Sequence, residues 1–278
     1  MDWQLAHETH AIERVTVTFL FKETVPSKTW ATILERAVAD AGPVGFNSLP
    51  SASETGHRNS GVTELIINIG GPGLVQAGGG AAAPSARTFI RLSDVGEEQD
   101  RLTLQRNLLA YSTSLYGGWG DFIDTTEKLI AKSLDLALTT VDVGMVKLEY
   151  WDRFVFIGDE NSIDYNEVIS NESKFVPSFF VAEKGLWHSH IGYFADPGTS
   201  ARRLINLNVD VIDVAGPPDP EAPEGTVIPR RSVGIYSMAQ DTLEVGGAEG
   251  SVSVRGSTLD EMHTILKEVL ANAITPVI

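Results

Sequence analysis

The sequence predicts an α+β fold in which antiparallel sheets carry their helices on one side. Two observations lead to this prediction. Three segments have the apolar spacing of amphipathic helices, and segments between them alternate apolar with polar residues, as half-buried antiparallel strands do. The order is β-α-β-β-β-α, followed by strand, short segment, three strands and helix. We therefore expect two similar β-α-β-β-β-α-like halves, residues 1–140 and 141–278, packed as one compact unit.

The expected helices span residues 28–41, 119–137 and 257–273. Ser27 has the residue type of a helix N-cap, and Gly42 follows the first helix as a stop signal. Thr258 and Glu261 have the spacing of a capping box at the start of the third helix. Each helix has one apolar face, so each needs a sheet or another helix to cover it.

The expected strands span residues 14–22, 63–69, 87–92, 102–108, 143–156, 179–194, 203–214 and 228–238. Two connections, residues 70–84 and 216–223, are rich in glycine and proline, and Ala195–Thr199 contains the residues of a tight turn. The first connection lacks the Gly-Lys-Ser/Thr ending of a phosphate-binding loop, so we interpret it as a flexible hairpin connection.

Composition restricts the function classes. The chain has 21 basic and 37 acidic residues and a formal net charge of −16, which argues against nucleic acid as a partner. This charge favours solubility, and it also suits a surface that recognises a basic protein partner. There is no apolar run long enough for a membrane helix, and residues 1–8 have no secretory signal character. The chain has no cysteine, which fits a cytoplasmic location.

His188 and His190 are the first candidates for a site. They lie two positions apart on an expected strand, so their side chains point to the same face. The next strand carries Asn206, Asn208 and Asp210, again with alternate spacing. If the two strands pair so that the histidines lie directly opposite Asn206, Asn208 or Asp210, all five side chains share one face. A register shifted by one residue would put the histidines on the opposite face from the other three.

Three readings of this face stay open. His188, His190 and Asp210 have the donor types of a zinc or iron site, although asparagine is a poor ligand for either ion. The same groups could bind a small ligand or transfer protons. The third reading is a structural network of polar side chains, and on this reading no metal or other cofactor is required.

The expected strand Val143–Phe156 adds a row of charges. Lys147, Glu149 and Arg153 lie on one of its faces, and such charges are costly to bury unless they pair or meet solvent. One interpretation is a solvent-facing ladder of compensating charges. The other is a polar groove in which Lys147 and Arg153 contact an anionic ligand.

Common catalytic signatures are missing: the sequence has no Gly-x-Ser-x-Gly nucleophile elbow and no His-Glu-x-x-His zinc helix. His263 lies in the third expected helix. We expect it to have a role at the helix surface or in capping.

Two motifs support a resemblance to a known family: Tyr116-Gly-Gly-Trp119-x-x-Phe122 at the start of the central helix, and Leu148-Glu-Tyr-Trp-Asp-Arg-Phe154 on the following strand. They resemble motifs of a sporadically distributed bacterial family of uncharacterised proteins of similar length. That family has an arginine at the position of Glu149 and an asparagine at the position of Asp152. Its closing helix often contains a histidine after an acidic residue, as Asp260-Glu-Met-His263 does here. The resemblance supports the fold and implies no established activity.

The function expected from these observations is that of a cytoplasmic, non-enzymatic binding protein. Its acidic surface would engage a protein partner, and the scattered distribution of the resembled family suggests a toxin-neutralising or phage-defence setting. The alternative is an enzyme or small-ligand receptor that uses the polar groove around His188, His190 and Asp210, with or without a divalent metal.

Overall fold

The computed structural model describes residues 2–49, 84–195, 201–216, 228–243 and 252–275. Its strands form a ten-stranded antiparallel sheet. Along the sheet the order is β3-β4-β5-β6-β2-β7-β10-β9-β8, and the short β1 pairs with one end of β7. The fold is therefore α+β, as the alternation of the strands predicted.

The strands are β1 Trp3–Leu5, β2 Ile12–Phe21, β3 Asn47–Leu49, β4 Ala86–Leu92, β5 Glu98–Gln105, β6 Leu108–Thr113, β7 Val143–Phe156, β8 Trp187–Ala195, β9 Ala201–Ala215 and β10 Pro229–Leu243. The helices are α1 Ser27–Ala41, α2 Trp119–Thr126, α3 Lys132–Leu138, α4 Ser178–Val181 and α5 Ser257–Ala273. A π-helical turn, Glu127–Ala131, joins α2 to α3.

The strand order is similar on the two sides of the sheet centre. In the first half, β2 pairs with β6, the last strand of that half; in the second, β7 pairs with β10. The two first strands, β2 and β7, pair with each other and join the halves into one sheet. The short strands β1 and β3 and the four-residue α4 break the correspondence. A common origin of the halves stays a prediction.

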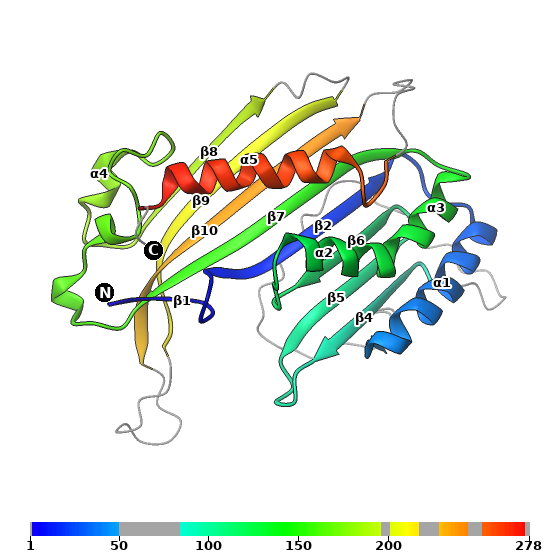
Figure 1. Cartoon of the computed structure of the whole chain (residues 1–278), viewed down its shortest axis with the longest axis horizontal. Helices are drawn as coiled ribbons and strands as arrows, with labels where there is room; N and C mark the ends of the chain where they lie inside the picture. Colours follow the sequence, from blue (N-terminus) through cyan, green and yellow to red (C-terminus); the bar gives the residue numbers. More distant parts are fainter. Residues whose placement is uncertain (1, 50–83, 196–200, 217–227, 244–251, 276–278) are drawn as a thin grey trace.

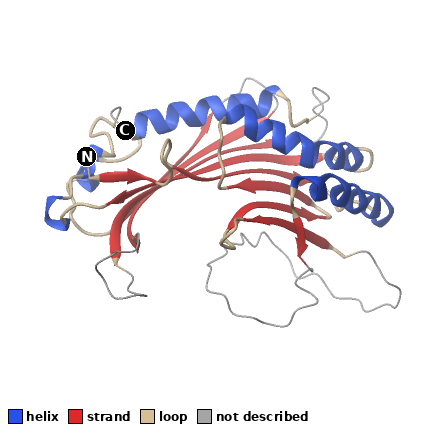
Figure 2. Ribbon diagram, turned by 60° about the horizontal axis from the view of Figure 1, so that its bottom comes forward, coloured by secondary structure: helices blue, strands red, loops and turns tan. Residues whose placement is uncertain are grey.

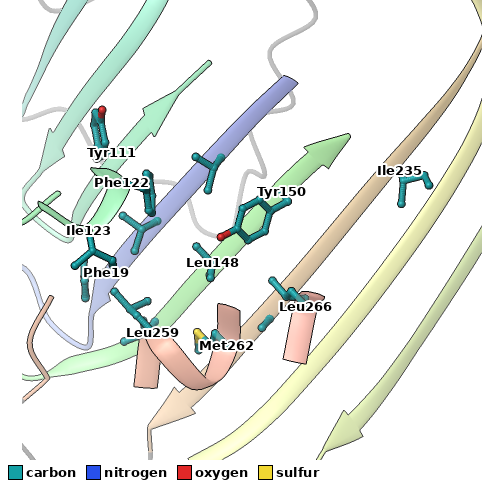
Figure 3. Close-up of a cluster of buried hydrophobic side chains, with 14 of the residues drawn as sticks. Phe19, Tyr111, Phe122, Ile123, Leu148, Tyr150, Ile235, Leu259, Met262 and Leu266 are labelled. Atoms are coloured by element: carbon teal, nitrogen blue, oxygen red, sulfur yellow. The ribbon is translucent and has the colours of Figure 1, made fainter. Parts of the chain in front are cut away.

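The long helices lie on one face of the sheet, and the opposite face curves away from them (Figures 1 and 2). Alternate residues of β2 and β7, among them Phe19 and Leu148, point toward the helices and are fully buried. Figure 3 shows these side chains meeting Phe122 of α2 and Met262 of α5 in one cluster. The apolar stripe of each helix is thus buried against the sheet, which is why the amphipathic pattern predicted the helices well.

The predicted helix starts need correction. Ser27 is the first residue of α1, Pro26 precedes it, and the α1 N-terminus has no side-chain cap. The capping box is also wrong: Gly256 occupies the N-cap position of α5, so Thr258 lies inside the helix. The backbone continues through Gly42 into a short 3-10 turn, and the left-handed residue is Gly45, with φ of 85°.

Two strand predictions also change. The predicted strand 102–108 is not one strand: β5 ends at Gln105, the chain reverses at 106–107, and Leu108 begins β6. The segment 179–194 begins with α4 and becomes a strand only at Trp187. The expected strand 63–69, residues 70–83 of the first predicted connection, and residues 196–199 and 217–223 of the other two lie outside the described residues.

Among the described residues, no helix combines the length and apolar character that crossing a bilayer requires.

Candidate functional site

The face of the sheet away from the helices, here called the open face, carries all eight of the predicted site residues. In the β8–β9 pairing, His188 lies opposite Asp210 and His190 lies opposite Asn208. Asn206 lies opposite Gly192, where the missing side chain leaves room for it. This is the register that the prediction required, so the five polar side chains of these two strands share one face.

The contacts on the open face are those of a surface network. His188 Nδ1 contacts Asp210 Oδ1, and the two side chains are 55% and 41% exposed. His190 points along the same face, with its ring 6.4 Å from that of His188. The described residues contain no group of three or more metal-ligating side chains arranged to hold an ion. The metal prediction for His188, His190 and Asp210 gains no support from this arrangement.

The charges of β7 are paired with one another or with neighbouring strands. Lys147 Nζ lies 2.9 Å from Glu149 Oε2, and the Tyr236 hydroxyl donates to Glu149 Oε1 at 2.7 Å. Arg153 binds Glu13 at 3.0 Å and donates to the Ser232 hydroxyl. Each cation proposed as an anion ligand already has a carboxylate partner. The charges therefore compensate one another, but Lys147 and Glu149 do not face solvent, because their side chains are only 14% and 7% exposed.

Removing the His188 contact should have little effect on folding. An exposed ion pair contributes at most about 1 kcal/mol, because water screens it and ordering the side chains costs entropy. We expect His188→Ala to change the free energy of unfolding by less than about 1 kcal/mol in urea titrations. A loss of several kcal/mol would show that the open face is a stability element instead of a free surface.

The second candidate site lies on the helix side of the sheet, where α5 crosses β7 and β10 (Figure 1). A cavity of about 400 Å³ opens there. We call it the α5 pocket. Its lining comes from the N-terminal segment, the start of α2, both central strands and α5: Ile12, Tyr116, Trp119, Tyr150, Asp152, Ser237, His263, Leu266, Lys267 and Leu270.

Local backbone geometry places the aromatic wall of the pocket. Gly118 precedes α2 with φ of 121°, a conformation that side chains rarely adopt, and the chain turns there. This turn separates Tyr116, in the loop, from Trp119, in the first turn of the helix. Tyr116 then meets Tyr150 edge to face, with ring centroids 5.9 Å apart.

His263 lies inside this wall. Its ring stacks on Trp119 at 4.3 Å with an interplanar angle of 3°, and its Nδ1 is hydrogen-bonded to the Tyr150 hydroxyl at 2.9 Å. The Trp119 indole donates to Asp260, one turn earlier in α5. Burial, together with the nearby Lys267 ammonium, lowers the pKa of His263 to about 4, so its ring is neutral at pH 7. The expected surface or capping role for His263 was wrong.

Asp152 is the unusual residue of the pocket. It is 2% exposed, and its Oδ2 is buried without a hydrogen-bond partner. Its neighbours across the sheet are Ile12 on β2 and Ile235 on β10, so no polar side chain flanks it there. Burial raises the pKa of Asp152 to about 7. A buried polar atom without a partner is uncommon in a folded protein and calls for a structural explanation.

The sequence contained two signals for this pocket. Tyr116, Trp119, Tyr150 and His263 all belong to the motifs on which the family resemblance rests, and the structure gathers them around one cavity. Asp152 interrupts the otherwise apolar and aromatic face of β7, where Leu148 and Phe154 are fully buried. A lone carboxylate on the core-facing side of a strand is the pattern that could have identified the site.

Comparison with protein-family models and with curated proteins gives no match for this chain. The function proposed for this chain therefore rests on the geometry of the open face and the α5 pocket.

Proposed function

We propose that this chain is a non-enzymatic binding protein that takes a small organic ligand in the α5 pocket. The observation that carries the proposal is the unpartnered, buried carboxyl of Asp152 on the wall of a 400 Å³ cavity. Small-ligand sites are typically mostly apolar cavities of about 300–1,000 Å³ with a few placed polar groups. The α5 pocket has this size and this composition.

Some polar groups of the pocket bind one another and fix its shape, whereas Asp152 is left for a ligand. Tyr150 and Trp119 hold His263 through a hydrogen bond and a ring stack, so the wall has a defined shape before a ligand arrives. Asp152 lines the same cavity, and its Oδ2 has no hydrogen-bond partner. A preformed wall reduces the entropy that binding costs, which supports a receptor for a compact, flat molecule.

A pocket-filling variant tests this proposal. Leu270 lines the pocket from α5 and is half-buried, so Leu270→Trp should occupy the cavity while leaving the sheet intact. We expect small aromatic probes, such as benzyl alcohol, to shift the Trp119 indole N–H resonance of the unaltered protein and to leave that of Leu270→Trp unchanged. Leu136→Trp, a half-buried position on α3 away from the pocket, is the matched control.

Either of two results would overturn the proposal. The first is that no aromatic probe shifts any resonance of the pocket residues. The second is that Leu270→Trp binds the probes as well as the unaltered protein does, which would place binding elsewhere.

A second function, binding of a protein partner, is favoured by the open face. Apolar side chains are exposed on or next to its β8 edge: Phe194 is 58% exposed, Ile212 40% and Leu186 59%. Arg202 lies over the Phe194 ring at 4.0 Å. Aromatic residues and arginine are enriched at protein interfaces. The acidic partner surface expected from the net charge stays a separate prediction, because Lys147 and Arg153 of this face are paired with Glu149 and Glu13.

Site-specific cross-linking distinguishes this second function. A photoreactive residue at position 194 samples the open face, and one at Val38, an exposed position on α1, samples the helix layer. We expect a protein adduct in cells from position 194 and not from position 38. Equal labelling from both positions would remove the open face as the interaction surface.

A further inference from the structure

The α5 pocket contains a negative site without a positive partner. Asp152 faces the cavity from β7, and neither Lys267 nor any other cation of the described residues forms an ion pair with it. Lys267 lies at the exposed edge of the pocket on α5, near His263. A buried carboxylate is strongly destabilised until an opposite charge or several donors reach it.

The walls beside Asp152 suit a positive charge. Tyr116, Trp119 and Tyr150 supply aromatic rings, whose faces carry partial negative charge and attract cations. One face of Trp119 is covered by His263, and the two tyrosines meet edge to face. The pocket can therefore surround an apolar cation with ring surface while one carboxylate oxygen receives its hydrogen bond.

Charged residues outside the pocket also favour a cation as the ligand. Two exposed acidic residues lie close to Trp119: Asp121, two positions further along α2, and Asp260 of α5, which accepts a hydrogen bond from the Trp119 indole. Lys267 is the basic residue of this region that lines the pocket. Carboxylates around an opening raise the local concentration of cations and lower that of anions.

We propose that the α5 pocket binds a small organic cation, a primary ammonium group on a flat apolar body, with Asp152 as its counter-ion. This inference rests on the proposed function and adds the charge class of the ligand. The ammonium group would donate to the carboxylate of Asp152, which lines the pocket and whose Oδ2 has no hydrogen-bond partner. The apolar body would lie among Ile12, Leu266 and the aromatic rings.

The proposal has a pH signature. Burial places the pKa of Asp152 near 7, whereas an alkylammonium keeps its proton to about pH 10, as lysine does. The affinity for the cation should therefore rise between pH 5 and pH 8 as the carboxyl ionises. Burial keeps the pKa values of Tyr150 and Tyr116 above their ordinary value, and His263 is neutral throughout this interval. Lys267 of α5 also lines the pocket, Asp260 of α5 accepts a hydrogen bond from the Trp119 indole, and the His10 ring contacts Tyr116.

Three probes of equal shape test the charge class: benzylammonium, benzyl alcohol and benzoate, titrated by calorimetry and by the Trp119 indole resonance at pH 8. We expect benzylammonium to bind about 10- to 100-fold more tightly than benzyl alcohol, the range of one charge-assisted hydrogen bond. Benzoate should bind more weakly than the alcohol. In Asp152→Asn the ammonium and the alcohol should bind equally, and the pH dependence should disappear. Asp121→Asn, which changes an exposed carboxylate two positions after Trp119 in α2, should keep the preference.

The outcomes separate the two proposals. If all three probes bind with equal affinity, the pocket is a ligand site and the cation inference is wrong. The inference also fails if Asp121→Asn removes the preference and Asp152→Asn keeps it, because the selectivity would then come from surface charge. If no probe binds, both the cation inference and the proposed function are wrong.

Discussion

Replacing Arg203 with alanine should destabilise the protein by about 3–5 kcal/mol, because it leaves Asp241 as an uncompensated buried charge. Arg203 on β9 donates two hydrogen bonds of 2.7 Å to Asp241 on β10. The two side chains are only 5% and 3% exposed. Glu261 of α5 lies 3.4 Å away, so the pair also connects the sheet to the helix that borders the α5 pocket.

Urea unfolding measures the loss of stability in Arg203→Ala. The double variant Arg203→Met with Asp241→Leu tests whether this loss comes from the charge left on Asp241. Because the double variant removes both charges, we expect it to regain most of the lost stability. Arg36→Ala is the control: Arg36 also makes a two-point contact, with Asp40, but on the partly exposed surface of α1. Its loss should cost about 1 kcal/mol or less. A similar small cost for Arg203→Ala would mean that water reaches Asp241.

Replacing Asp152 with asparagine should stabilise the protein at pH 8 and have little effect at pH 4. The pKa of Asp152 is about 7 in the folded protein, above its ordinary value near 4. Between these values the unfolded chain loses the proton while the folded protein keeps it, so the free energy of unfolding falls as pH rises. Above pH 7 the full penalty is present, up to about 4 kcal/mol for three pH units. Asparagine has the same shape as the protonated acid and no charge to bury.

Thermal unfolding of both proteins from pH 4 to pH 8 tests this prediction. The difference between variant and unaltered protein should grow with pH and level off above pH 7. Asp94→Asn, an exposed residue in the β4–β5 turn, should show no such trend. A constant difference for Asp152→Asn at all pH values would mean that the pKa of Asp152 is the same in the folded and unfolded protein.

The open face shows how far strand alternation can predict a site. Alternation alone placed Lys147, Glu149 and Arg153 on one side of β7, and the structure agrees. Whether His188 and His190 shared a face with Asp210 depended on the β8–β9 register, which backbone pairing over the whole strand determines. The sequence therefore predicted the residues of this face, and the structure supplied the pairing that joins them.

The α5 pocket was not predicted as a site, because the residues that line it are far apart in the sequence. Its walls come from segments far apart in the chain: Tyr116 before α2, Asp152 on β7 and His263 on α5. Helical spacing identified the apolar stripe of α5, but it could not show that His263, at the edge of that stripe, faces a tyrosine 113 residues away. Such contacts depend on the packing of the helix across the strands.

Local apolar spacing was enough to predict the type and the buried side of the long elements, although it missed the helix α4 at the start of the predicted strand 179–194. It predicted β7 with its observed limits and the three long helical segments, including the one that contains the π-helical turn. Tertiary structure decided which strands became neighbours, that the charges of the open face pair with each other, and that Asp152 remains without a partner inside a cavity. These properties depend on burial and on distances between remote residues, which the order of amino acids alone does not reveal.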